Sequence, residues 1–101
     1  MIFDKYTLKK TQLRNRIVMA PMTRNMSPGG VPTQDVINYY ERRARANVGL
    51  IITEGIEISH DASSAYPNVP RLDSDASIDA WKTLVNGIKI NDGAVIGQLW
   101  H

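Results

Sequence analysis

The sequence predicts an α/β protein built on a parallel sheet, with the order strand, helix, strand, helix, strand. Three short and nearly continuous apolar runs, at residues 16–20, 50–53 and 94–101, are typical of strands covered on both faces. Two amphipathic stretches separate these runs. A helix between two strands of one sheet makes the strands parallel, with a right-handed crossover.

The chain begins with residues 3–14, which alternate loosely between apolar and polar and predict a short hairpin or an extended lead-in. The first apolar run, 16–20, is closed by Pro21, which has no N–H to donate to a strand partner, so the strand should end there. Residues 24–32 contain prolines and glycines in the pattern of a loop.

The first helix is predicted over residues 34–47. Thr33 is a suitable N-cap, and Gly49 marks the end. Apolar residues recur every fourth position, which places them on one face: Val36, Tyr40, Ala44 and Val48.

The second strand, Leu50–Thr53, is followed by a connection over residues 54–74 that is long enough to be functional or mobile. Ser74 or Asp75 can cap the second helix, and the turn at residues 91–93 leads into the last strand. The helix carries an apolar stripe, which places its tryptophan in the core: Ile78, Trp81, Leu84, Val85 and Ile88.

Composition excludes several classes of protein. The 101 residues suit one small domain, and 43% hydrophobic residues with 22% charged residues argue against disorder. A net charge of +2 is too small to indicate nucleic-acid binding. Arg42, Arg43 and Arg45 are interpreted as a solvated helix face, with a phosphate or nucleic-acid patch as the alternative. There is no cysteine, no membrane-length apolar run and no signal-peptide pattern, so we expect a soluble cytoplasmic protein without cysteine-ligated metal.

Two parallel folds compete for this pattern. A doubly wound dinucleotide domain needs G-x-G-x-x-G after its first strand, and the turn here offers only Gly29-Gly30. A β/α (TIM) barrel has eight strands over ~250 residues, and the spacing here matches its ~30-residue unit. We therefore predict a partial barrel with only the first three strands and two helices. Three strands cannot close, so this is either the opening segment of a larger barrel or a small open domain that needs partners.

Candidate chemistry lies where the three strands end, because parallel strands bring their carboxyl ends to the same edge. These ends carry Pro21-Met22-Thr23, Thr53-Glu54-Gly55 and Gln98-Leu99-Trp100-His101. Alternation places Gln98 and Trp100 on one face, where an amide suits the polar edge of a planar heterocycle and an indole can wall the pocket. Gly55 lets a ligand or backbone approach closely. The alternative is a satisfied core glutamine, a packing tryptophan and a turn glycine.

The order of three blocks closely resembles the opening of the old yellow enzyme family of NAD(P)H:flavin oxidoreductases. The blocks are Asn15-Arg-Ile-Val-Met-Ala-Pro-Met-Thr-Arg24, Gly49-Leu-Ile-Ile-Thr-Glu-Gly55 and Gly97-Gln-Leu-Trp-His101, with Tyr39-Tyr40 and Arg42-Arg43-Ala44 between the first two. The resemblance covers nearly the whole chain. It implies an FMN-containing β/α barrel that passes hydride from NADPH or NADH through the flavin to an activated alkene such as an enone.

The resemblance also implies roles for single residues. Pro21 and Met22 would supply backbone at the flavin ring, and the Thr23 hydroxyl would bond near flavin O4 and tune the reduction potential. Gly55 resembles the small residue beside the flavin carbonyl edge. Gln98 resembles the side-chain contact to the pyrimidine end, and Trp100 the aromatic residue that shapes the substrate side. The role of His101 stays open.

Other parts of the family pattern fall outside residues 1–101. These are the pair that grips the substrate oxygen, the tyrosine proton donor and the phosphate-holding segment. No catalytic residue can be assigned here: His60 reads as a surface histidine, and nothing in the sequence pairs the carboxylates of Glu54 and Asp61 as acid and base.

The leading hypothesis is that residues 1–101 form the N-terminal part of an FMN-binding β/α barrel domain of an ene-reductase. The alternative is a truncated, non-catalytic remnant or interaction module that folds by self-association through its open sheet edges. A nucleotide-binding module lacks its glycine signature. No nucleic-acid or membrane partner is expected.

Overall fold

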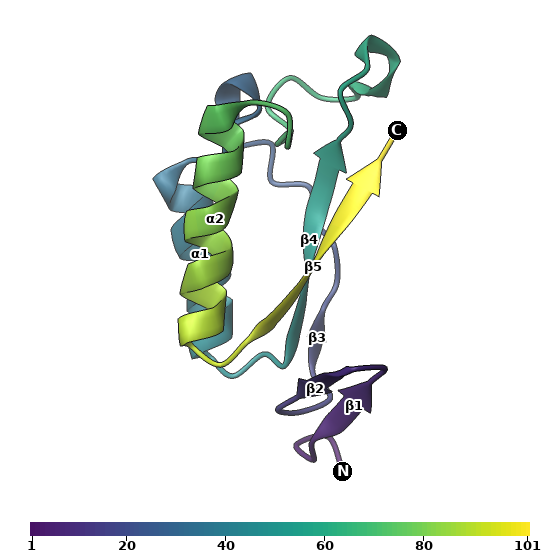
Figure 1. The fold of residues 1–101 in the computed structure, drawn as a ribbon, viewed down its shortest axis with the longest axis vertical. Coiled ribbons are helices and arrows are strands. Elements are labelled where there is room, and N and C mark those ends of the chain that lie inside the picture. Colours follow the sequence, from purple (N-terminus) through teal and green to yellow (C-terminus); the bar gives the residue numbers. More distant parts are fainter.

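The computed structural model describes residues 1–101 and shows an open α/β arrangement (Figure 1). Both helices lie on one side of a twisted sheet, and a small hairpin sits below the sheet, at the end where its strands begin (Figure 1). The elements are β1 (Tyr6–Leu8), β2 (Thr11–Leu13), β3 (Val18–Met19), α1 (Gln34–Arg45), β4 (Leu50–Glu57), α2 (Asp75–Ile90) and β5 (Ala94–Trp100), with 3₁₀ turns at Pro28–Gly30 and Asp61–Ser63.

The main sheet has the strand order β3-β4-β5, and both pairings are parallel. Each crossover carries a helix, which confirms the strand and helix order predicted from the sequence. The three strands form an open sheet that does not close on itself. β1 and β2 pair antiparallel, so the lead-in at residues 3–14 is a hairpin.

The strand bounds differ from the prediction in two places. β3 pairs only at Val18 and Met19, which is shorter than the predicted 16–20. β4 extends to Glu57 rather than stopping at Thr53, because its pairing with β5 continues as far as Glu57 opposite Trp100. The backbone N–H of Glu57 also donates to the Pro70 carbonyl at 2.9 Å. Glu54 and Gly55 therefore lie inside a strand, not in the loop after it.

A β-bulge interrupts β4 between Ile52 and Gly55. Ile52 pairs with Ile96 and Gly55 with Gln98, so β4 has one more residue than β5 between these pairs. A bulge breaks the strict alternation of side chains and re-aims the residues next to it. As a result Glu54 faces α1, where it bonds to Tyr40, while Gly55 lies under the Trp100 indole.

α1 begins at the predicted N-cap. The Thr33 hydroxyl oxygen accepts from the N–H of Val36 at 3.4 Å. The helix ends at Arg45, two residues before the predicted end, because Asn47 adopts a left-handed backbone with φ of 73°. Gly49 does not end the helix. It lies against Asn15, and a Cβ at this position would overlap the Asn15 side chain.

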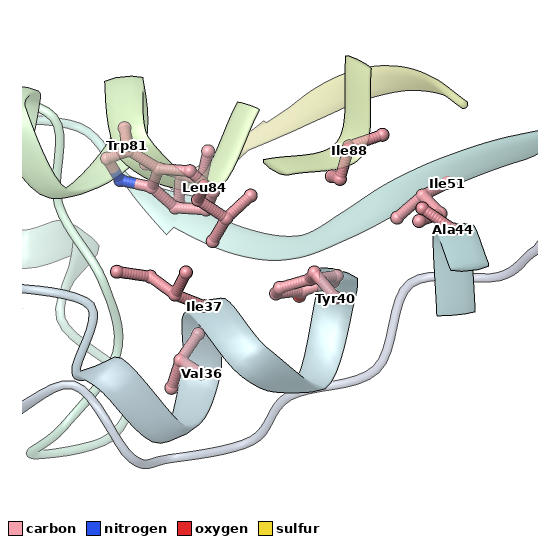
Figure 2. Packing of buried hydrophobic residues seen from close by; sticks show 9 residues of the cluster. Val36, Ile37, Tyr40, Ala44, Ile51, Trp81, Leu84 and Ile88 are labelled. Carbon is pink, nitrogen blue, oxygen red and sulfur yellow. The ribbon is translucent and has the colours of Figure 1, made fainter. Parts of the chain in front are cut away.

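α2 begins with a capping box, in which Ser74 and Ser77 exchange hydrogen bonds between side chain and backbone. Its inner face packs against α1 and β4 (Figure 2). Trp81 is buried as predicted, whereas Ile78 is 36% exposed, so the predicted stripe is wrong at this position. The core cluster is Val36, Ile37, Tyr40, Ala44, Ile51, Ile56, Trp81, Leu84 and Ile88. Neither helix has the length and apolar character that a bilayer crossing requires.

β5 is not the buried strand that its apolar sequence predicts. It lies at the sheet edge, and only one of its faces meets a helix. Val95 packs on the core, whereas Ile96 is 45% and Leu99 65% exposed. Within residues 1–101 β5 has one neighbouring strand and one covering helix layer, so the apolar side chains on its other face are exposed.

Candidate functional site

The register of the sheet brings the predicted strand-end residues on β4 and β5 together. Gly55 pairs with Gln98, and Glu57 with Trp100. The Trp100 ring crosses back over Gly55, so any Cβ at position 55 would overlap the indole. Pro21, Met22 and Thr23 follow β3, the neighbour of β4 on its other side, and all three are exposed.

The polar side chains of this group have no partners within the chain. The Thr23 hydroxyl and the Gln98 amide make no hydrogen bond to protein, although the Gln98 backbone N–H donates to the Thr53 hydroxyl at 3.2 Å. Trp100 Nε1 is buried and also lacks a partner. A hydroxyl and a primary amide together offer both donors and acceptors, which suits the polar rim of a flavin ring.

The structure explains why a glycine occupies position 55 without reference to any ligand. The group that approaches it closely is the Trp100 indole rather than backbone. The indole also lies 6.4 Å, centroid to centroid, from the ring of Tyr66 in the connection after β4. The contact of Gly55 with a flavin therefore stays a prediction, and the group that covers this position in the chain is the Trp100 indole.

A buried pair lies on the opposite side of β4 and was not anticipated from the sequence. Glu54 and Tyr40 are both fully buried. The Tyr40 hydroxyl donates to Glu54 Oε2 at 2.9 Å and accepts the Glu54 backbone N–H at 2.9 Å. The backbone N–H of Arg24 donates to Glu54 Oε1 at 3.4 Å. Glu54 thus fastens the loop that carries Thr23 to both α1 and the bulge in β4.

Burial dominates the electrostatics of this pair. It raises the pKa of Glu54, and the hydrogen bond from Tyr40 and the nearby Arg24 oppose the rise only in part. Burial likewise raises the pKa of Tyr40, helped by the negative charge of Glu54. One signal in the sequence pointed to the pair: a glutamate inside an apolar strand requires a donor, and Tyr40 is the one polar side chain in the apolar stripe of the first helix.

The connection after β4 is ordered over its second half. Arg71 Nε lies 3.5 Å from Glu57 Oε2 and 3.9 Å from Asp73 Oδ2, and the Arg71 carbonyl accepts the Trp81 indole N–H at 2.9 Å. His60 is exposed, as predicted, and its ring centroid lies 5.6 Å from that of His101. The connection therefore packs on α2 and on the end of β4 through Arg71, and it reaches the end of β5 through Tyr66 and His60.

These features define a segment of a β/α-barrel protein that presents unpartnered polar groups near the carboxyl ends of its strands. Residues 1–101 match the model of the NADH:flavin oxidoreductase / NADH oxidase family, and the chain belongs to that family. The family implies the use of a flavin and a nicotinamide.

Curated relatives include plant 12-oxophytodienoate reductases. The chain is 37% identical over 100 residues to 12-oxophytodienoate reductase 7 of Oryza sativa subsp. japonica and 33% identical to 12-oxophytodienoate reductase 2 of Arabidopsis thaliana. In both comparisons 99% of this chain is covered, against 25% and 26% of the relative. The chain thus spans about a quarter of the length of the curated relatives it matches.

Solved structures give the same result. Morphinone reductase superposes with a TM-score of 0.89 at 36% identity, and the Old Yellow Enzyme from Pichia sp. AKU4542 with 0.90 at 32%. Each match covers 99% of this chain and 26% of the other. Morphinone reductase has also been solved in complex with tetrahydroNAD. The three strands and two helices therefore correspond to one quarter of a β/α barrel, and the old yellow enzyme resemblance of the sequence is confirmed.

Proposed function

We propose that residues 1–101 supply part of the flavin site of an FMN-dependent ene-reductase. The observation that carries this proposal is the pair of unpartnered polar side chains Thr23 and Gln98, which lie beyond β3 and on β5 of one parallel sheet in a chain that belongs to a flavin-dependent family. The chemistry that FMN supplies when bound is hydride transfer from NAD(P)H to an activated alkene such as an enone.

Residues of this chain would bind and orient the ring. The Gln98 amide would bond to its pyrimidine edge, while the Thr23 hydroxyl would donate near O4. Pro21 and Met22 would offer backbone groups along the ring. Gly55 and Trp100 would shape the space beside it, with Trp100 on the substrate side. Glu54 would hold the loop of Thr23 in place through the Arg24 N–H, at 3.4 Å.

The test is made on the protein encoded by the whole reading frame. Its intact mass, its visible spectrum and the mass of the released cofactor show whether FMN is bound. Gln98→Ala should weaken FMN binding by the ~1–3 kcal/mol of a lost buried hydrogen bond. Gln12→Ala, an exposed glutamine on β2, is the matched control and should bind FMN as the wild type does. A protein without flavin, or a Gln98→Ala variant of unchanged affinity, contradicts the proposal.

Residues 1–101 expressed alone should not be an active reductase and should not hold FMN tightly. The three strands reach one side of the ring only, and no residue here is assigned as proton donor. Flavin fluorescence titration and turnover of cyclohexenone with NADPH measure both properties. Binding at micromolar affinity or turnover would overturn this part of the proposal.

A second candidate function is supported by the open face of the sheet. Val18 is 48% and Ile96 45% exposed on this face, and Leu99, which is on the edge strand β5, is 65% exposed. Exposed apolar strands at a sheet edge favour association with another chain. An interaction module of this kind would self-associate without binding flavin. Light scattering of residues 1–101 decides this: we expect oligomers, whereas a compact monomer excludes the module.

A further inference from the structure

A hollow of about 270 Å³ lies beside α1, next to the loop that follows β3. Three arginines line it: Arg24 from the loop, and Arg42 and Arg43 from α1. Tyr39 and Asp35 complete much of its wall. No residue of β4 or β5 contributes, so the hollow is separate from the predicted flavin contacts at Gly55 and Gln98.

Two of these guanidinium groups are held against one aromatic ring. Arg43 Cζ lies 3.6 Å and Arg24 Cζ 4.5 Å from the centroid of Tyr39. Contact with a ring engages the face of a guanidinium and leaves its N–H edge free to donate. Arg43 uses one of its donors on the Tyr39 carbonyl at 3.1 Å, which fixes the direction of its side chain. Arg24 Nη1 donates to the Met22 sulfur at 3.5 Å, and the other side-chain N–H groups of Arg24 and Arg43 make no hydrogen bond to protein.

The arginines have no carboxylate partner. None of the three forms an ion pair, although Arg45 pairs with Glu41 and Arg71 with Glu57 in the same molecule. Arg42 makes no side-chain hydrogen bond at all to protein. Asp35 lines the hollow without pairing with any of them. Three positive charges thus share a small space with one negative charge, an arrangement that an anion would stabilise.

We infer that this hollow binds a phosphoryl group, either free phosphate or the phosphate of a monoester. Guanidinium groups bind phosphate oxygens through paired, charge-assisted hydrogen bonds, and their planar forks match that geometry better than a lysine does. The volume of about 270 Å³ is several times the ~30 Å³ that a water molecule occupies in the liquid, so a tetrahedral phosphate fits. The sequence left open a phosphate patch on this helix. The structure adds Arg24, which comes from the loop after β3, and the three arginines together line a pocket.

Calorimetric titration of the full chain tests the inference without any flavin, so its result is independent of the proposed function. The probes are inorganic phosphate and glycerol phosphate, with sodium chloride at the same ionic strength as the reference for screening. Phosphate should bind and chloride should not. Equal affinity for the two phosphates indicates the free ion as ligand, and tighter binding of glycerol phosphate indicates a monoester.

Single substitutions assign the binding to this hollow. Arg42→Gln should weaken phosphate binding about tenfold or more, the value of one charge-assisted hydrogen bond. Because Arg42 has no partner in the protein, the variant should keep its fold, which circular dichroism verifies. Arg45→Gln, on the same helix but outside the hollow, should bind phosphate as the wild type does. Asp35→Asn removes the one negative charge and should strengthen binding.

Three outcomes overturn the inference. They are no phosphate binding by the folded wild type, equal losses in Arg42→Gln and Arg45→Gln, and a weaker rather than stronger affinity of Asp35→Asn. The first excludes the site, the second places any binding elsewhere on the basic surface, and the third contradicts the argument that excess positive charge in the hollow drives binding.

Discussion

The two faces of the β3-β4-β5 sheet differ in almost every physical respect. The face toward α1 and α2 carries the core, with Ile51, Leu84 and Ile88 fully buried (Figure 2). The same face holds the bonded pair Glu54–Tyr40. The other face carries exposed apolar side chains such as Val18 and Ile96, and polar groups without partners such as Gln98.

As a result, residues that stabilise the fold and residues that could bind a ligand lie next to each other on the same strand. On β4, adjacent residues belong to different faces: Glu54 bonds to Tyr40, while Gly55 lies beneath Trp100. The bulge makes this possible by adding one residue to β4. Substitutions on the helix-covered face should therefore change the free energy of unfolding, and those of exposed side chains on the open face should change ligand binding instead.

The largest effect is expected in the core. Ile51→Ala removes a fully buried side chain between the sheet and α1, and should lower the free energy of unfolding by ~2–5 kcal/mol. Ile96→Ala on the open face is the matched control and should cost ~1 kcal/mol or less, because its side chain is 45% exposed. Urea denaturation compares them, and equal losses would remove the distinction between the faces.

The next largest effect is expected for Tyr40→Phe, which should lower the free energy of unfolding by ~1–3 kcal/mol. The substitution leaves the Glu54 carboxylate buried without its hydroxyl donor, and the Glu54 backbone N–H without its acceptor. Tyr39→Phe is the control on the neighbouring, half-buried ring, whose hydroxyl makes no hydrogen bond to protein, and it should be nearly neutral. A neutral Tyr40→Phe would show that water replaces the hydroxyl at this site.

Gly55→Ala should cost ~1–3 kcal/mol, because the new methyl group overlaps the Trp100 indole and must displace it. Trp81 stays in the core, so any change in tryptophan emission reports on Trp100. Gly29→Ala is the comparison variant without a steric overlap. Nothing lies near the Cβ position of residue 29, and the only strain there is a backbone φ of 65°. A stable Gly55→Ala variant with unchanged emission would mean that the indole does not rest on this residue.

The pH dependence of stability should change with Glu54. Because burial raises its pKa in the folded state, the folded state favours the protonated form. The contribution of Glu54 to stability is thus full below the ordinary pKa of about 4.5 and is lost as pH rises through the raised value. Glu54→Gln has no such titration. The free energy of unfolding of the wild type should therefore fall relative to that of the variant as pH rises from about 4.5 through the raised pKa of Glu54. A difference in unfolding free energy that is constant with pH would contradict the raised pKa.

The smallest effect on stability is expected at Thr23. Its hydroxyl is exposed and unpartnered, so Thr23→Ala should change the free energy of unfolding by ~0.5 kcal/mol or less. In the flavin-bound protein the same substitution should lower the reduction potential, since a donor that stabilises the anionic reduced ring is lost. A redox titration measures this, and an unchanged or raised potential argues against contact between Thr23 and the flavin.

The sequence by itself determined the order and type of the elements, the parallel sheet and the family. Strong periodicity in α1 and α2 and short apolar runs between them leave little choice of fold class, and local caps such as Thr33 and Ser74 could be read from neighbouring residues. The residues of the candidate site were also visible, because motifs at strand ends are contiguous in the chain.

Only the tertiary structure decided how these pieces face one another. The bulge depends on the register between β4 and β5, and a one-residue offset reverses every face that alternation predicts. The pairing of Glu54 with Tyr40 and the gathering of Arg24 with Arg42 and Arg43 join residues from separate elements. The exposure of β5 depends on which layers surround it, and apolar content does not contain that information. The periodicity of the sequence shows whether a residue is suited to a buried or an exposed position. Contacts between separate elements depend also on how the loops place those elements, and the pattern does not specify this.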